Sequence, residues 1–510
     1  MHPLDILLVL LLAPAAFAAP TRARGPAAWW RWLARAAVVC VALQAVVGLP
    51  RWQFGAAYAV TAWLFISLWR ARADRPRRTA QRRAITWLRT VCLAGLFAIT
   101  LVLALGFPVF TPPMPSGANR VGRVRFVLDA DAPIDPLAHD GSRRLLPILV
   151  WYPAAPVPGA SPELFWPDAP IATPAALSLA GLPRLNPLSH LHTIRSHSYP
   201  DAPIASSQAR YPVVVFSHGY GSTPWQNSVQ MEELASHGFI VFSVGHPYES
   251  AGLVFPDGHL LVGDGERMRA VFAQAREARA SSGDRPHAML DQSLDLWVQD
   301  IGRLVDHLES IDDGTSRDQG LPTPLMAHRL DRSRLGVFGM SFGGSAAAEF
   351  CLRDDRCAAA LNMDGRQHGR AETTPLDVPL LYFVREGNTL NDDIYGRSTG
   401  DRYRVEVTGA RHWNFSDASL VAPILELAGL LGRIDGRRTE AVLNAYTLAF
   451  FDRYLRDGRW RLLFAAPSTA GFPEVVLSPH LAPIEPPTIR LSPPRPGSYT
   501  RKSTPARSRP

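Results

Sequence analysis

The sequence RLGVFGMSFGGSAAAEF joins a β-branched run to a helical run of small residues through Gly339-Met340-Ser341-Phe342-Gly343. A Gly-x-Ser-x-Gly motif between a strand and a helix forms a sharp turn, in which the serine backbone is strained and the glycines remove side chains that would clash with it. The N-terminus of the following helix also favours negative charge that develops beside the serine. A plain glycine-rich turn is the alternative interpretation. The flanking strand and helix favour Ser341 as a nucleophile.

The chain around this motif alternates short β-branched runs with helical patterns, which is typical of a sheet flanked by helices. The predicted strands are Arg123–Asp129, Leu146–Tyr152, Val213–Ser217, Ile240–Gly245, Leu335–Gly339, Ala359–Met363, Leu380–Arg385 and Arg404–Val407. Between the fourth and fifth, LDLWVQDIGRLVDHLESI has apolar residues at helical spacing and predicts a crossover helix to a parallel strand. We predict an α/β-hydrolase fold over residues 111–480 and a disordered Pro-rich basic tail over 481–510.

A serine hydroxyl becomes a nucleophile when a general base accepts its proton, and in this fold the base follows the serine along the chain. His412, in GARHWNFSD, comes after the last predicted strand, on a loop from which its ring can reach Ser341. The other downstream histidines are His368, close to an acid candidate, and His480, near the C-terminal tail. We therefore predict that His412 is the base.

The acid that orients this histidine has two candidate positions. Asp364 ends the predicted strand AAALNMD, and Gly365 after it allows an abrupt turn that would aim the carboxylate across the edge of the sheet. Asp392 and Asp393 follow the predicted strand LLYFVRE, the position at which many α/β-hydrolases carry the acid. Spacing along the chain does not decide between them.

The oxyanion hole of this fold uses two backbone N–H groups, one from the residue after the nucleophile and one from a loop after an earlier strand. Phe342 is the residue after Ser341. The earlier loop is HGYG, residues 218–221, whose glycines let the backbone approach a substrate oxygen. We predict the N–H groups of Phe342 and Tyr220 as the two donors, and a structural role for His218 in the turn.

Residues 1–110 differ from the rest of the chain in charge and hydropathy. They contain thirteen Arg, two Asp and no Lys or Glu, a net charge of +11 in a chain whose total is +8. Four apolar runs lie there, at residues 4–19, 36–50, 54–69 and 85–110. The arginines cluster after the first and third runs, a distribution that the positive-inside rule explains better than nucleic-acid binding does. We predict a membrane anchor of about four transmembrane helices.

The same arginine clusters predict the orientation of the anchor, because they place the first and third loops in the cytoplasm. Everything after Phe110 then lies outside the cytoplasm. We expect a multi-pass protein, of a bacterial inner membrane, with its catalytic domain on the extracytoplasmic side. A cleaved signal peptide is the alternative for the first run, but His2 and Asp5 stand where a signal peptide carries basic residues.

The four cysteines are too few for a disulfide framework in a chain of this length. Cys40 and Cys92 lie in apolar runs. Cys351 and Cys357, in EFCLRDDRC, flank a short polar stretch at the end of a predicted helix, so they are a possible disulfide in an oxidising compartment. Two free thiols are the equal alternative.

Metal and cofactor sites have no matching pattern in the sequence. His190, His192 and His197 lie close together in SHLHTIRSH, but no helical i, i+4 pair with a carboxylate accompanies them. Walker and dinucleotide glycine patterns are absent from the sequence. We expect neither a metal nor a cofactor.

Several segments between Pro112 and Asp457 together resemble platelet-activating-factor acetylhydrolases of the plasma type and their bacterial relatives. The matching segments are PPMPSGANRVG, WYPA, VVFSHGYGS, LASHGFIVFSVGHPYES, GMSFGG, the strand that ends at Asp364, and HWNFSD. The resemblance implies Asp364 rather than Asp392 as the acid, and Tyr220 and Phe342 as oxyanion donors. The sequence departs from the family at Met340, where histidine is common, and in its apolar N-terminal runs.

The resemblance implies hydrolysis of carboxylic esters without metal or cofactor. We expect a serine hydrolase, acetylhydrolase-like or lipase-like, that acts on a small ester or lipid with a short acyl chain or a phospholipid-type leaving group. Two alternatives use the same residues differently: a membrane-tethered acyltransferase with the same triad, and a non-catalytic hydrolase-like binding domain.

Overall fold

The computed structural model describes residues 3–21, 29–47, 51–70, 80–129, 131–179, 186–280, 288–321, 325–456, 458, 461–464 and 471–482. Contacts and hydrogen bonds are stated for these residues. The predicted tail at 481–510 lies outside them, apart from Leu481 and Ala482.

A ten-stranded sheet with the order β12-β11-β10-β9-β8-β4-β5-β2-β1-β3 organises the fold. Its strands are β1 (Arg120–Leu128), β2 (Leu146–Ala154), β3 (Ser198–Pro200), β4 (Tyr211–Ser217), β5 (Ile240–Val244), β8 (Leu330–Met340), β9 (Cys357–Met363), β10 (Leu380–Arg385), β11 (Arg402–Val407) and β12 (Val475–His480). Neighbours from β11 to β5 pair in parallel, whereas β2 is antiparallel to β5 and β1, and β12 is antiparallel to β11. The predicted mostly parallel sheet is confirmed, and all eight predicted strands lie in it.

Helices cover both faces of this sheet, as the wholly buried strand β4 requires. Val213 and Val215 of β4 point into one core, which α8 (Ala288–Asp312) and α9 (Phe342–Arg353) complete. Val214 and Phe216 point into the other, formed with α6 (Ser228–Ser236) and α12 (Gly436–Arg456). The alternation follows from the two-residue period of a strand.

The predicted crossover helix is α8. Leu294, Val298, Ile301, Val305 and Leu308, the residues that carry its helical spacing, are all buried. The remaining elements are α5 (Ala169–Leu179), α7 (Gly265–Ala280), α10 (Asp392–Arg397), α11 (Ala418–Val421), the hairpin of β6 (Gly252–Val254) and β7 (Leu260–Val262), and the short 3-10 helices η1 (Trp52–Phe54), η2 (Ser189–Thr193), η3 (Arg370–Glu372), η4 (His412–Phe415), η5 (Pro423–Glu426) and η6 (Arg461–Leu463).

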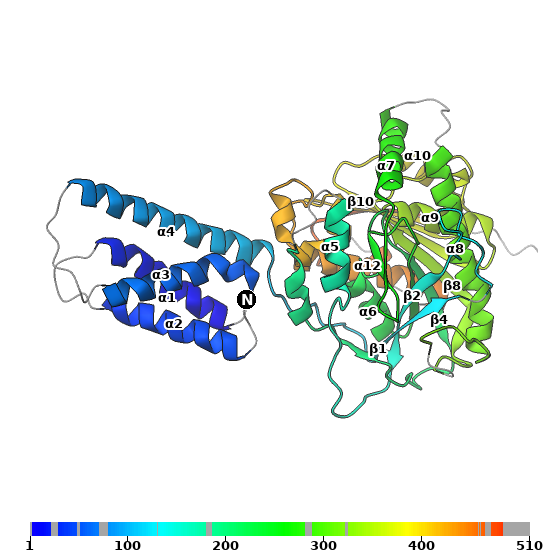
Figure 1. Cartoon of the computed structure of the whole chain (residues 1–510). Helices are drawn as coiled ribbons and strands as arrows, with labels where there is room; N and C mark the ends of the chain where they lie inside the picture. The colour runs from blue at the N-terminus through cyan, green and yellow to red at the C-terminus, as the bar shows by residue number, and fades with distance from the viewer. Residues whose placement is uncertain are drawn as a thin grey trace, which may run out of the picture.

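The N-terminal apolar runs form four helices that lie side by side as a bundle next to the domain that contains the sheet (Figure 1). They are α1 (Pro3–Thr21), α2 (Trp29–Val46), α3 (Gly55–Arg70) and α4 (Ala80–Gly106). The bundle has a core of its own, to which Leu8, Ala37, Val60 and Leu93 contribute. Many large apolar side chains on these helices face outward, among them Leu10, Trp32, Val46, Trp69 and Trp87.

One helix in the described part of the chain is long and apolar enough to cross a membrane: the 20-residue segment Trp87–Gly106 of α4, with a mean hydropathy of 2.2. The prediction of about four transmembrane spans is therefore supported for α4 alone. Physical reasons for the difference lie in the other three helices. α2 contains Arg31 and Arg35, and α3 has 16 residues. In α1, the segment Pro3–Pro14 is apolar among the residues whose side chains the structure describes.

The C-terminal end of α4 packs directly on the sheet domain (Figure 1). A Cβ at Gly106 would lie 2.7 Å from Cβ of Ile424 in η5, so glycine permits this close approach. The next residue, Phe107, contacts the ring of His190 and accepts a hydrogen bond from Gln53 of the bundle at 2.9 Å. The bundle and the sheet domain are thus joined by packing as well as by the chain.

Candidate active site

Ser341 lies at the sharp turn between β8 and α9, with φ 56° and ψ −121°, a backbone conformation that non-glycine residues rarely adopt. A Cβ at Gly343 would lie 2.0 Å from the carbonyl oxygen of Ser217. One at Gly339 would lie 2.2 Å from the carbonyl carbon of Gly343. Both motif glycines are required by these close approaches, as the sequence analysis predicted for this turn.

His412 begins η4, just after β11, and its ring lies between Ser341 and Asp364. Its Nε2 is 3.0 Å from Oγ of Ser341, and its Nδ1 is 2.6 Å from Oδ2 of Asp364. Because an ionised carboxylate only accepts hydrogen bonds, Nδ1 carries the proton and Nε2 is free to accept one from the serine hydroxyl. The His412 side chain is 31% exposed, so a substrate can reach this end of the series.

Asp364 follows β9 and its side chain is fully buried. Besides His412, its carboxylate accepts hydrogen bonds from the Arg385 guanidinium, from the Arg385 N–H at 3.2 Å and from the Asn388 amide at 2.7 Å. Burial alone would raise the pKa of Asp364, but the bond from His412 and the charge of Arg385 outweigh it and hold that pKa below its usual range.

The rival carboxylates lie elsewhere. Asp392 and Asp393 begin α10, and Asp392 pairs with Arg404 at 3.2 Å. Among the described residues, Asp364 is the carboxylate that contacts His412. Of the three candidate carboxylates, Asp364 is the one that lies next to His412 in the structure.

Tyr220 and Phe342 lie against each other, with ring centroids 5.4 Å apart in an edge-to-face arrangement. Phe342 is the first residue of α9, so the helix itself offers no acceptor to its N–H. Tyr220 lies in the turn after β4. No hydrogen bond from either N–H to a described residue occurs, so both N–H groups are available to an incoming oxygen.

Comparison with known proteins identifies the family. The family model described as "Platelet-activating factor acetylhydrolase, isoform II" matches residues 186–460, more than half of the chain. The chain belongs to the platelet-activating factor acetylhydrolase, isoform II family. The resemblance read from the sequence motifs is thereby confirmed.

Individual members of the acetylhydrolase family are distant relatives. The platelet-activating factor acetylhydrolase of Cavia porcellus is 26% identical over 259 residues, which cover 48% of this chain and 58% of the relative. A probable 1-alkyl-2-acetylglycerophosphocholine esterase of Arthroderma benhamiae is 24% identical over 52% of this chain and 65% of its own. The chain thus spans about three fifths of the length of these curated relatives.

A solved structure extends the comparison to the fold. The ferulic acid esterase of Streptomyces cinnamoneus superposes with a TM-score of 0.56 at 25% sequence identity, over 72% of this chain and 99% of its own. The superposition covers most of this acetylhydrolase-family chain, and the sheet domain is the larger part of it. The esterase structure therefore agrees with the mixed α/β architecture described above.

Glu249 is a residue of this acetylhydrolase-family site that the sequence analysis did not single out. Its buried carboxylate accepts hydrogen bonds from Tyr220 Oη at 3.1 Å, Arg267 Nε at 2.7 Å, Ser293 Oγ at 2.5 Å and Trp297 Nε1 at 2.6 Å. Its backbone carbonyl accepts the N–H that follows Tyr220, at 2.9 Å. Glu249 therefore holds the turn that presents the Tyr220 N–H, and its segment GHPYES was visible only as part of the family resemblance.

A second Ser–His–Asp series lies inside the sheet domain and has a different character. Ser217 Oγ is 3.0 Å from His246 Nε2, and His246 Nδ1 is 2.8 Å from Asp300, which also pairs with Arg144 at 2.7 Å. All four side chains are buried, and burial lowers the pKa of His246. No ester can reach Ser217, so this series holds strands and α8 together.

The other histidines considered in the sequence form hydrogen bonds within the protein. His218 is buried, with Nδ1 2.8 Å from the Gly219 carbonyl and Nε2 2.8 Å from Ser250 Oγ, and burial keeps its pKa well below the usual value. His190 and His197 each contact a different backbone carbonyl. The described residues contain no group of three or more side chains able to hold a metal ion.

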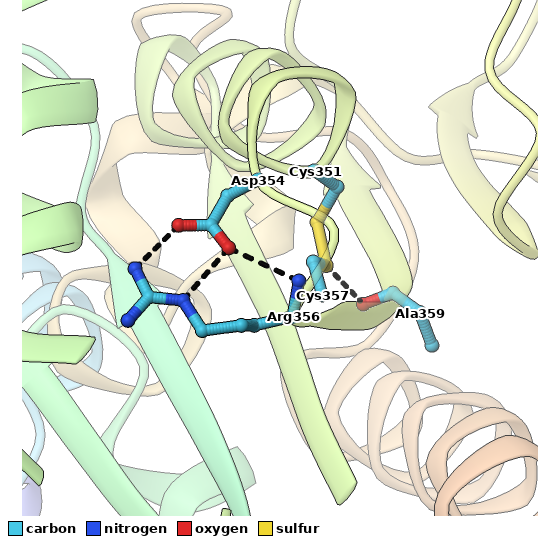
Figure 2. The surroundings of a disulfide bond; sticks show 5 residues. All are labelled: Cys351, Asp354, Arg356, Cys357 and Ala359. Carbon is cyan, nitrogen blue, oxygen red and sulfur yellow. Dashed lines mark hydrogen bonds and ion pairs between the residues drawn. A yellow bond between two sulfur atoms is a disulfide. The ribbon is translucent and has the colours of Figure 1, made fainter. Parts of the chain in front are cut away.

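Cys351 and Cys357 are joined by a disulfide bond (Figure 2). It links the C-terminal part of α9 to the first residue of β9, so it connects the helix after Ser341 to the strand that ends before Asp364. Within the loop, Arg356 pairs with Asp354 at 2.5 Å (Figure 2). The disulfide lies at the far end of both elements from the Ser341 site.

Proposed function

We propose that this chain hydrolyses carboxylic esters, with Ser341 as nucleophile, His412 as general base and Asp364 as the acid that orients His412. The observation that carries the proposal is the unbroken hydrogen-bonded series from Ser341 Oγ through the His412 ring to Asp364, at 3.0 and 2.6 Å. The names of the family and of its esterase relatives support the same chemistry.

In the proposed mechanism, Ser341 Oγ attacks the ester carbonyl carbon while His412 Nε2 takes the hydroxyl proton. The carbonyl oxygen becomes an oxyanion that accepts hydrogen bonds from the Phe342 and Tyr220 N–H groups. The intermediate collapses when the bond to the alcohol breaks and His412 returns the proton to that alcohol. Water then attacks the acyl-enzyme with His412 again as base, which releases the carboxylic acid and restores the Ser341 hydroxyl.

We further propose a short acyl group and a phospholipid-type leaving group for the substrate. Support comes from the names of two relatives, a platelet-activating factor acetylhydrolase and a probable 1-alkyl-2-acetylglycerophosphocholine esterase. The rings of Phe272 and Phe342 both lie edge-to-face against Tyr220, at 5.5 and 5.4 Å. An aromatic surface of this kind, next to the nucleophile, suits an apolar group of limited size.

We also propose that α1 to α4 anchor the chain in a membrane, with the sheet domain on the extracytoplasmic side. The apolar segment Trp87–Gly106 and the outward-facing apolar side chains of the bundle support this placement. The arginine clusters after α1 and α3 support the orientation. The disulfide of Cys351 and Cys357 agrees with an oxidising compartment.

The test of the chemistry is hydrolysis of p-nitrophenyl esters, from acetyl to palmitoyl, by the full chain in mild detergent. Ser341→Ala should lower kcat by roughly 10⁴-fold or more while circular dichroism stays unchanged. Asp364→Asn should cost a comparable factor because it removes the acceptor that fixes the His412 tautomer, whereas Asp393→Asn should not. Full activity in Ser341→Ala would overturn the proposal.

A further inference from the structure

A cavity of about 1030 Å³ lies where the helical bundle meets the sheet domain. Its walls come from both parts: Pro3 and Arg51 from the bundle, residues 108–111 from the connection after α4, and residues 193–195 and 431–437 from the sheet domain. We call it the neck cavity. Its volume is at the upper end of the roughly 300–1,000 Å³ typical of small-molecule sites, and neither Ser341 nor His412 lines it.

The depth of the neck cavity follows from the apolar span of α4. Trp87–Gly106 has 20 residues, and at 1.5 Å per residue its length is about 30 Å, the thickness of a bilayer's hydrocarbon core. After this span, the chain lines the cavity from Pro108 onward, two residues past Gly106. In the proposed membrane placement, the cavity therefore lies in the layer of lipid head groups.

Four guanidinium groups and two carboxylates line the neck cavity. They belong to Arg51, Arg195, Arg433, Arg437, Glu426 and Asp435. In the described part of the chain, Arg195, Arg433 and Arg437 form no ion pair with any carboxylate. Arg195 and Arg437 each donate one hydrogen bond to a backbone carbonyl, at 2.6 and 3.0 Å. Arg195, Arg433 and Arg437 are exposed, and each guanidinium has five N–H donors, so most of these donors bind no acceptor in the described part of the protein.

Arg51 contributes a buried cationic side chain to the wall of the neck cavity. Its side chain is 6% exposed and pairs with Asp5, yet its Nε has no hydrogen-bond partner among the described residues. An N–H that is buried without an acceptor is costly.

Apolar side chains form the rest of the wall, including Val109, Phe110, Leu420 and Ile434. A free phosphate ion makes no apolar contacts with such a wall, whereas the glycerol and first methylene groups of a lipid can pack against it. We propose that the neck cavity binds the phosphate group of a membrane glycerophospholipid, with Arg195 and Arg433 as its main hydrogen-bond donors. This inference rests on the proposed membrane placement of the bundle and is independent of the proposed ester chemistry.

The bound lipid would also be close to the loop that carries His412. Asn414 lines the neck cavity, and its Oδ1 accepts the N–H groups of Arg411 and Gly432, at 2.8 and 2.7 Å. It thus ties the loop of His412 to the segment that carries Arg433. The lipid is proposed as a structural ligand at the junction and not as the substrate.

The experiment uses the full chain, extracted from membranes in mild detergent, with phosphatidylglycerol as the probe and native mass spectrometry to count retained lipid. The double variant Arg195→Gln/Arg433→Gln should bind the lipid at least about tenfold more weakly than the wild type, because charge-assisted hydrogen bonds to phosphate are lost. The control Arg317→Gln/Arg332→Gln removes the same charge from exposed positions away from the neck cavity and should bind like the wild type.

Inorganic phosphate separates the two possible sources of the ligand. Retained phosphatidylglycerol should resist millimolar phosphate; its displacement by phosphate would overturn the lipid assignment, as would equal lipid binding by the wild type and Arg195→Gln/Arg433→Gln. Ser341→Ala should retain lipid normally, so a failure of the ester chemistry leaves this test intact. If the wild type remains in the soluble fraction without detergent, the membrane placement fails and the inference fails with it.

Discussion

Arg385 lies directly beside Asp364, the proposed acid. Its guanidinium and the His412 ring both bind Oδ2 of Asp364, and its own N–H binds the other oxygen. A fixed positive charge at this position keeps Asp364 ionised, but it also competes with the imidazolium that forms during catalysis. A substitution at Arg385 can therefore change the electrostatic environment of Asp364 without altering Ser341.

Replacing Arg385 should therefore change the pH dependence of the reaction. Arg385→Gln removes a positive charge that favours the ionised form of Asp364. The acid limb of kcat/KM against pH should move to higher pH, because the charge of Arg385 is one of the causes that keep the pKa of Asp364 low. The matched control is Arg397→Gln, an exposed position that binds a backbone carbonyl of η3. An unshifted limb, with activity otherwise retained, would show that Arg385 serves only packing.

Residues of the candidate site that belong to a local sequence pattern could be predicted, whereas those without such a pattern could not. Ser341 was visible in the Gly-x-Ser-x-Gly turn, and His412 in its position after the last strand. Glu249 and Arg385 carry no such pattern, because their partners come from distant parts of the chain, 44 residues away for Ser293 and 21 for Asp364. For the same reason, spacing along the chain did not decide between Asp364 and Asp392 or Asp393 as the acid.

At the scale of elements, Glu249 links three parts of the fold: the turn after β4, helix α7 through Arg267, and helix α8 through Ser293 and Trp297. Glu249→Gln keeps the shape but loses the charge that Arg267 binds. We expect kcat to fall by about tenfold to a hundredfold with little change in KM, because loss of one oxyanion donor costs about 10²–10³ and here the donor is only loosened.

A control separates this positioning effect from loss of stability. Asp312 is also buried and pairs with an arginine, Arg210, at 2.7 Å, at the opposite end of β8 from Ser341. Asp312→Asn should lower Tm about as much as Glu249→Gln does, but its kcat should remain near the wild-type value. Equal losses of kcat in both variants would leave Glu249 with a structural role only.

The disulfide should affect stability but not activity. The loop between Cys351 and Cys357 is short, with a sequence separation of 6, and closing a loop of this size contributes roughly 2 kcal/mol to stability. Cys351→Ala/Cys357→Ala should therefore lower Tm by several degrees and leave kcat intact, since Ser341 precedes the opposite end of α9. Calorimetry and ester hydrolysis on one sample check both parts; a collapse of kcat in a folded variant would contradict it.

Sequence patterns predicted the long strands but not the short ones. Val213–Ser217 and Leu380–Arg385 are buried apolar runs, whose composition is sufficient to identify them. The strands β3, β6 and β7 have three residues each, and β12 is half-exposed with a proline inside, so none has a detectable period. The N-terminal helices were predicted as helices, but their capacity to span a membrane also depends on length and charge, which set α4 apart from α2 and α3.

At the scale of the whole molecule, a pair of buried carboxyls makes stability depend on pH. Burial raises the pKa of Glu440 in α12 to about 8, and burial together with nearby Glu440 raises the pKa of Asp417. Below the usual Glu pKa of 4.5, which applies to the unfolded chain, Glu440 is protonated in both states. Between that value and about 8, only the unfolded chain has lost the proton, so the free energy of unfolding decreases as pH rises.

Glu440→Gln should remove much of that decrease. At pH 9 the variant should be more stable than the wild type, and at pH 4 the two should unfold at similar denaturant concentrations. Urea titrations at several pH values measure the difference. A variant that is equally destabilised at both pH values would indicate that the hydrogen bond from Gln230 to Glu440, and not the buried charge, dominates.

The contact of Gly106 with Ile424 has a kinetic consequence in the proposed membrane placement. With no flexible stalk between α4 and the sheet domain, Ser341 stays at a constant height above the bilayer and meets its ester by lateral diffusion within the leaflet. The relevant substrate quantity is then a mole fraction in the membrane and not a bulk concentration. Diluting the ester with inert lipid should slow turnover even when the total amount of ester is unchanged.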